Sequence, residues 1–231
     1  MRALSLFSCL PLEREDLREA ATHVRMTQVT VRTDGRRGQG SICRIGEEEI
    51  LVFTAVHVIG DAEDGTVLFS PQAGSSFEAP FSVLARSDAE DAILLSVRTT
   101  DIPPQITLGL REIAGETPDE SRVSVNAGQE DDPDRVFPAE GTSLFCFCGE
   151  EVRAGVMLDV PAFQRKAAEN ADGVPADARY CLMSADPGMS GGAIFDARGC
   201  AVGMILGGNE EIVAFLPAEK IKTINEEKSF R

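Results

Sequence analysis

The chain has 231 residues, of which 43% are apolar, so it can bury a core in one large domain or two small ones. Its formal net charge of -16 at pH 7 repels phosphate backbones and anionic lipid surfaces. No stretch approaches the ~18 apolar residues that a membrane-spanning helix needs. We therefore expect a soluble globular protein that has neither nucleic acid nor membrane as its partner.

The first 26 residues are predicted to be an extension that contains one short helix. Residues 12–26 combine good helix formers with acidic side chains early and His23 and Arg25 late, the charge order that a helix dipole favours. In such a polar helix His23 is interpreted as a solvated side chain. Arg2 precedes only a short apolar run, and no small-x-small cleavage site follows. A cytoplasmic location is favoured, with secretion or the periplasm as the alternative.

From residue 27 onward, short β-branched and apolar runs alternate with turn clusters. The predicted strands are TQVTVRT, SICRI, EILVFTAVHVI, TVLFS, FSVLA, AILLSV, RVSVN, SLFCFC, VRAGVML, RYCLMS, GAIFD, AVGMIL and EIVAFL. Many short strands with frequent turns are typical of an all-β barrel or sandwich. Polar, acidic segments at 109–122 and 126–141 divide the strands into two groups, so we predict β domains at 27–112 and 113–217.

The end of the chain is predicted to be a helix at 218–231. Pro217 suits a first helical turn, and Ile221 and Ile224 share one face of such a helix.

The six cysteines, at positions 9, 43, 146, 148, 181 and 200, are too dilute for a disulfide scaffold. None forms the Cys-x2-Cys pair of a zinc site, and strand alternation at 146–148 places both thiols on one face. We interpret the cysteines as reduced and mostly buried. The chain has two histidines and no His-Glu-x-x-His motif, so a metal hydrolase has little support and no metal or cofactor is expected.

The stretch ADPGMSGGAIFD, residues 185–196, places Ser190 among one proline and three glycines. Taken alone it favours a plain turn. A serine becomes a nucleophile only beside a general base, usually a histidine that a carboxylate orients. His57, in VFTAVHVIG, lies at the end of an apolar run and is the candidate base, although a lone histidine beside apolar residues is more often structural.

Three carboxylates, Asp88, Glu90 and Asp91, come just before the predicted strand AILLSV. Each alone is typical of a charged turn. Asp91 directly abuts the strand, which makes it the best-placed candidate to orient a histidine.

The order His, Asp, Ser within TAVHVI, DAILL and PGMSGGAI resembles the chymotrypsin-like serine peptidases, and within them the bacterial trypsin-like and HtrA-type branch. The likeness extends through GQGSICRIGEEEILVFTAVHVIG, FSVLARSDAEDAILLSV and VAFLPAEKIKTI, and it covers roughly residues 27–226. Each motif is weak alone, whereas their order and spacing together are specific.

This resemblance implies two six-stranded Greek-key β-barrels with short N- and C-terminal helices and a site in the cleft between the barrels. The first barrel would carry His57 and Asp91, and the second would carry Ser190. Ser190 would attack the scissile carbonyl, His57 would transfer its proton, and Asp91 would orient the imidazole. The backbone N–H groups of Gly188 and Ser190 would form the oxyanion hole.

The resemblance also implies a substrate pocket. Ser184 and Ala185 would form one wall, and Gly208 and Val213 would come from the two strands after the nucleophile. Ser184 stands where trypsin-type members have a carboxylate, and Asp186 lies closer to the loop surface than to a pocket floor. A small apolar pocket is therefore expected, which favours Ala, Val or Leu before the cut bond over Arg and Lys.

Some positions depart from the family pattern. Val58 replaces the cysteine that follows the histidine in many secreted members, and Met189 replaces the aspartate that receives a newly cut N-terminus in zymogen-type relatives. Activation by that route is not expected. Gly191 and Gly192 are expected to allow close packing behind the nucleophile. The HtrA branch continues into a PDZ domain, and none is expected here because the chain stops at Arg231.

Two functions from different classes follow. The first is a serine endopeptidase with a protein or peptide substrate and no cofactor. The alternative is a catalytically silent double barrel that binds peptides or partners, since a fold does not guarantee chemistry.

Overall fold

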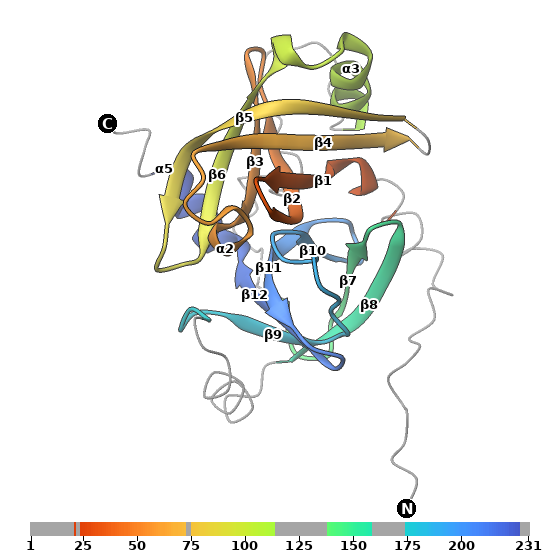
Figure 1. The fold of residues 1–231 in the computed structure, drawn as a ribbon. Helices are drawn as coiled ribbons and strands as arrows, with labels where there is room; N and C mark the ends of the chain where they lie inside the picture. Colours follow the sequence, from red (N-terminus) through yellow and green to blue (C-terminus); the bar gives the residue numbers. More distant parts are fainter. Residues whose placement is uncertain (1–20, 22–23, 73–74, 114–137, 159–173, 227–231) are drawn as a thin grey trace, which may run out of the picture.

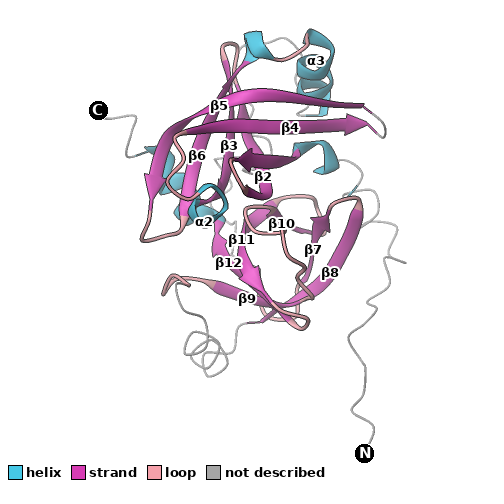
Figure 2. Cartoon of the chain, viewed as in Figure 1, coloured by secondary structure: helices cyan, strands magenta, loops and turns pink. Residues whose placement is uncertain are grey.

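A computed structural model describes residue 21 and residues 24–72, 75–113, 138–158 and 174–226. The strands form two closed barrels of six antiparallel strands each, β1–β6 above and β7–β12 below in Figure 1. Strand dominates and the helices are few and short (Figure 2). The predicted all-β class and the implied pair of six-stranded barrels are confirmed.

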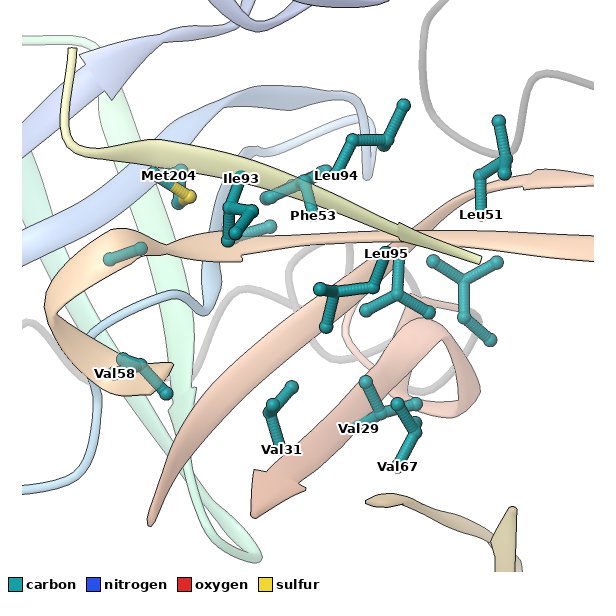
Figure 3. Packing of buried hydrophobic residues seen from close by; sticks show 14 of the residues in the cluster. Val29, Val31, Leu51, Phe53, Val58, Val67, Ile93, Leu94, Leu95 and Met204 are labelled. Carbon is teal, nitrogen blue, oxygen red and sulfur yellow. The ribbon is translucent and has the colours of Figure 1, made fainter. Parts of the chain in front are cut away.

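The first barrel has the strand order β1-β2-β3-β6-β5-β4. Its strands are β1 (Gln28–Thr33), β2 (Arg36–Ile45), β3 (Glu49–Ala55), β4 (Asp64–Gln72), β5 (Ser75–Ser87) and β6 (Ala92–Arg98). Residues 50–55 of β3 are buried without alternation, which indicates that both faces of this strand are covered. One face fills the barrel and the other meets the second barrel, where Met204 shares a core cluster with Phe53 and Ile93 (Figure 3).

The second barrel has the strand order β10-β11-β12-β9-β8-β7. Its strands are β7 (Ser143–Cys148), β8 (Glu151–Leu158), β9 (Arg179–Leu182), β10 (Ala193–Asp196), β11 (Ala201–Gly208) and β12 (Ile212–Pro217). The two faces of β7 serve different cores. Cys146 and Cys148 pack with the second-barrel cluster, as strand alternation predicted. Phe145 and Phe147 belong to the cluster that extends from the first barrel, where Phe145 stacks on Phe195 with ring centroids 5.4 Å apart.

The helices differ from the predicted pattern in two places. The run EILVFTAVHVI, predicted as one strand, divides into β3 and a single helical turn, α2 (Val56–Ile59). A helix that was not predicted, α3 (Pro104–Ile113), follows the 3-10 turn η2 (Thr99–Asp101). The sequence features that favour this helix are the proline at its first position and apolar residues spaced four apart. The polar residues around them made the segment resemble a loop.

The C-terminal helix α5 (Ala218–Glu226) begins directly after Pro217 and lies against β5 and β6 of the first barrel (Figure 1). The 3-10 turn η1 (Arg25–Thr27) precedes β1. Most of the helix predicted at 12–26, including His23, lies outside the described residues, and so does the strand predicted at 122–126. Among the described helices, none combines the length and the apolar character that crossing a membrane would require.

Candidate functional site

His57 and Asp91 come together where β3 ends and β6 begins. His57 is the second residue of α2, and its side chain is 46% exposed, whereas that of Asp91 is 17% exposed. The Nδ1 atom of His57 lies 2.6 Å from Oδ2 of Asp91, and the backbone N–H of His57 donates to Oδ1 at 3.0 Å. One carboxylate therefore holds both the ring and the backbone of the histidine.

The backbone of Asp91 also supports α2. Its carbonyl accepts the N–H of Val56 at 3.2 Å, and its own N–H donates to the carbonyl of Asp88 at 3.3 Å. These bonds matter because Ala55, the residue before α2, supplies no side-chain cap. Asp91 has φ +48°, a left-handed conformation that aspartate adopts more readily than most L-residues. The turn before β6 thus fixes the helix that carries the imidazole.

Two arginines from other strands hold the carbonyl groups of the same turn. Arg36 of β2 donates to the carbonyl of His57 at 2.9 Å, and Arg86 of β5 donates to that of Gly60 at 2.6 Å. Arg86 also pairs with Asp88 at 2.8 Å, and this hydrogen bond lowers the pKa of the Asp88 carboxyl. Asp88 is therefore engaged by an arginine, and Asp91 is the carboxylate that meets His57.

Ser190 is held against the first barrel by its backbone. The N–H of Gln39 on β2 donates to the carbonyl of Ser190 at 2.9 Å, and the Gln39 side chain donates to the carbonyl of Phe147 at 3.0 Å. Ser41, also on β2, accepts the N–H of Ala193 at 2.9 Å. Because β2 contacts α2, these bonds bring the segment around Ser190 to the edge of the first barrel that carries His57.

The hydroxyl of Ser190 donates to the carbonyl of Leu206 on β11 at 3.2 Å. Among the described residues, no hydrogen bond joins Ser190 to His57. The structure thus unites Asp91 with His57, and it places Ser190 at the same junction of the barrels with its hydroxyl engaged elsewhere.

Residues 186–189 form the turn that precedes the serine. The N–H of Met189 donates to the carbonyl of Asp186 at 3.2 Å, and Gly188 has φ +93°. Proline in the second position and a glycine of positive φ in the third are the features of a type II turn. Gly188 is thus needed for its backbone conformation, since an added Cβ would meet nothing within 4 Å. Within the described part of the chain, no hydrogen bond engages the N–H of Gly188 or of Ser190.

Gly191 is required for a different reason. A Cβ at this position would lie 2.1 Å from the carbonyl oxygen of Gln39 and 2.2 Å from Oγ1 of Thr54. A Cβ at Gly192 would lie 2.2 Å from Oε1 of Gln39. The close packing expected behind the serine is confirmed, and its partner is the first barrel.

Three of the four residues predicted for a substrate pocket lie together. The N–H of Ala185 donates to the carbonyl of Asn209 at 2.8 Å, and Gly208 pairs with Val213 across β11 and β12. A Cβ at Gly208 would lie 2.9 Å from that of Ala185. Val213 is fully buried, and Ser184 is half-buried beside Ala185 in the chain. Their role as pocket walls stays a prediction.

Asp186 does not stand free beside these residues. Its carboxylate accepts a hydrogen bond from Arg153 of β8 at 2.9 Å. The Asp186 carboxylate is therefore already engaged by a basic side chain of its own barrel.

The described residues contain no group of three or more His, Cys, Asp or Glu side chains that could hold a metal ion. Burial raises the pKa of the Cys43 and Cys181 thiols to about 12, so both stay protonated and are poor nucleophiles at neutral pH.

Sequence reasoning missed several residues that shape this site, namely Arg36, Gln39, Arg86, Arg153 and Leu206. Glycines on both sides of Gln39 were a signal of close packing. The others lie in ordinary strand positions and carry no local signal.

Comparison with known proteins gives the family. Residues 38–204, well over half of the chain, match the model of the trypsin-like peptidase domain. Deg5 superimposes with a TM-score of 0.60 at 16% identity over 93% of this chain and 94% of its own. An inactive form of Rv3671c from M. tuberculosis H37Rv, a serine-to-alanine mutant, superimposes with a TM-score of 0.59 at 16% identity. This match covers 90% of this chain and 89% of that one.

A second structure, of the Rv3671c protease in an inactive form, gives a TM-score of 0.56 at 18% identity over 90% of this chain and 91% of that one. No curated protein matches. At these identities the structural neighbours establish the fold, and the family match establishes the kind of domain. The chain belongs to the trypsin-like peptidase family and has its chymotrypsin-like double-barrel fold.

Proposed function

We propose that this protein is an active serine endopeptidase, with Ser190 as nucleophile, His57 as general base and Asp91 as the group that orients the imidazole. The observation that carries the proposal is the double contact of Asp91 with Nδ1 and the backbone N–H of His57. When Nδ1–H donates to the carboxylate, Nε2 is left as an acceptor, which is the tautomer that can take a proton from serine.

The proposal requires the Ser190 hydroxyl to turn from its carbonyl partner toward the imidazole. This hydroxyl bonds a carbonyl at 3.2 Å, a neutral bond of ordinary strength, and a serine χ1 angle has three staggered positions. Hydrogen bonds within the site are often long or misaligned before substrate binds. In the proposed mechanism, the hydroxyl of Ser190 bonds the carbonyl of Leu206 before substrate binds.

The oxyanion hole is assigned to the N–H groups of Gly188 and Ser190. Support comes from the type II turn, which gives Gly188 its positive φ, and from the absence of any hydrogen bond to these two N–H groups within the described residues. Two such donors stabilise the negative oxygen of the tetrahedral intermediate and contribute on the order of 3 kcal/mol each.

A second candidate function is a silent double barrel that binds peptides. The bond from the Ser190 hydroxyl to Leu206 favours it, because in that position the serine has no general base.

A fluorophosphonate probe distinguishes the two functions. We expect it to label Ser190 and to leave Ser190→Ala unlabelled, because only a serine with an assembled base attacks the phosphorus rapidly. Mass spectrometry of the labelled peptide identifies the serine. A folded wild-type protein that reacts no faster than its Ser190→Ala variant would establish the silent alternative.

Substrate preference is expected to be aliphatic just before the cut bond. Ala185 and Gly208 are small residues that lie close together, and the Asp186 carboxylate already accepts a hydrogen bond from Arg153. A peptide library should therefore be cut after Ala, Val or Leu in preference to Arg or Lys, with discrimination of roughly 10-fold to 200-fold. Asp186→Asn is the control, and it should leave the profile unchanged. Dominant cleavage after Arg or Lys that disappears in Asp186→Asn would instead make Asp186 the specificity residue.

A further inference from the structure

The turn at residues 186–189 is tied to the second barrel by side chains at both of its ends. At one end Met189 is buried in the second-barrel core, and its Sδ accepts the N–H of Asp186 at 3.1 Å. At the other end the carboxylate of Asp186 accepts hydrogen bonds from Arg153 at 2.9 Å and from Cys148 at 3.4 Å. The two residues between these ends, Pro187 and Gly188, are exposed.

The shape of this turn decides where one N–H group points. Type I and type II turns differ by a rotation of their central peptide, which here joins Pro187 to Gly188 and carries the N–H of Gly188. Pro187 and Gly188 suit the type II form, but glycine adopts either sign of φ at little cost, so these two residues leave the other form open. The contacts at the two ends of the turn add to their preference and hold the central peptide in place.

Arg153 is the charged side chain at one of these ends. It lies on β8 opposite Cys146, and the nitrogen that bonds Asp186 also lies 2.9 Å from the Glu151 carboxylate. Its Nε is buried with no hydrogen-bond partner among the described residues. An orphaned donor of this kind costs stability, so the guanidinium is held in this place by its two carboxylate partners, Asp186 and Glu151.

Cys148 strengthens the same contact. Burial and then the hydrogen bond to Asp186 raise the pKa of the Cys148 thiol, so the thiol stays protonated and donates to the carboxylate. Asp186 therefore has two donors from neighbouring strands of the second barrel, and both pull its side chain toward β7 and β8.

We propose that Arg153 is a positioning residue, which acts through Asp186 to hold the turn at 186–189 in the form that directs the Gly188 N–H to the oxyanion. The proposal rests on the proposed peptidase function. Its consequence is specific: loss of the guanidinium weakens binding of the negatively charged oxygen and leaves peptide binding in the ground state intact.

The test compares two variants. Arg153→Met removes the guanidinium and leaves an unbranched apolar side chain, whereas Arg153→Lys keeps a positive charge. We expect Arg153→Met to lower kcat about 10-fold to 100-fold with KM within about threefold, because a misplaced oxyanion donor loses part of its effect. Affinity for a peptide aldehyde, which adds reversibly to Ser190 and forms an oxyanion, should fall by the same factor. Affinity for the matching peptide alcohol should not change, and Arg153→Lys should restore part of kcat.

Arg98→Met is the matched control. It removes an arginine that pairs with Asp101 at the same 2.9 Å on the first barrel, and it should leave kcat and both affinities unchanged. The proposal is overturned if Arg153→Met keeps kcat within twofold of wild type, if it weakens the alcohol as much as the aldehyde, or if Arg98→Met gives an equal loss. A wild-type protein that cuts no peptide and resists the fluorophosphonate would overturn the peptidase function itself.

Discussion

Ser190→Ala and His57→Ala are each expected to remove nearly all peptidase activity and to leave both barrels folded. Each change removes one member of a unit that acts together, and comparable single losses in serine peptidases lower kcat about 10⁶-fold. Folding should persist because neither side chain belongs to the core: His57 is exposed, and Ser190 is held through its backbone bond to Gln39. The measurement is kcat on a peptide that wild-type protein cuts, with circular dichroism to check the fold.

The double variant adds a sharper result. Because the two residues act as a unit, Ser190→Ala combined with His57→Ala should be no less active than either single variant. His57→Ala should also lose reaction with the fluorophosphonate, although its serine is intact. Activity within tenfold of wild type in either folded single variant would refute the mechanism.

Asp91→Asn is expected to lower kcat about 10⁴-fold. Asp91 accepts two donors, the ring Nδ1–H and the backbone N–H of His57, and an asparagine side chain has only one acceptor oxygen. If the amide NH₂ faces Nδ1, the ring must carry its proton on Nε2 and can no longer accept one from serine. If it faces the backbone N–H, two donors oppose each other and the turn that carries His57 shifts. Either arrangement impairs the base.

Asp88→Asn is the matched control, since it makes the same chemical change three residues away. The Asp88 carboxylate is exposed and pairs with Arg86, so its loss should change kcat by no more than about fivefold. Both variants are to be measured on the same peptide. Equal losses in the two variants, or a larger loss in Asp88→Asn, would mean that Asp91 does not orient the histidine.

Rescue by pH offers a further check on Asp91. If Asp91→Asn holds the His57 proton on Nε2, the imidazole cannot accept the proton of serine. The activity of this variant should then rise with hydroxide concentration, because a serine that loses its proton to solvent no longer needs the base. A merely misfolded variant would not regain activity in this way. The pH profile of Asp91→Asn against wild type therefore separates a tautomer defect from a structural one.

The sequence by itself determined the class of fold and the three candidate groups. Strand alternation and turn residues are local patterns, and they predicted short strands in two groups, with the cysteine pair of β7 on one face. The order of His57, Asp91 and Ser190 within their motifs carried a family resemblance, and that resemblance implied the double barrel. The helix α3 was missed although its signals are local, because a polar segment with a proline reads equally well as a loop.

Only the tertiary structure decided which groups touch. Asp91 lies 34 residues from His57, Arg153 lies 33 residues from Asp186, and Gln39 lies 108 residues from Phe147. Such contacts depend on how strands pair around each barrel and on how the barrels meet, and no local pattern encodes them. The partner of the Ser190 hydroxyl was also decided by the tertiary structure. A serine side chain can turn to any acceptor within reach, and the fold places the carbonyl of Leu206 there.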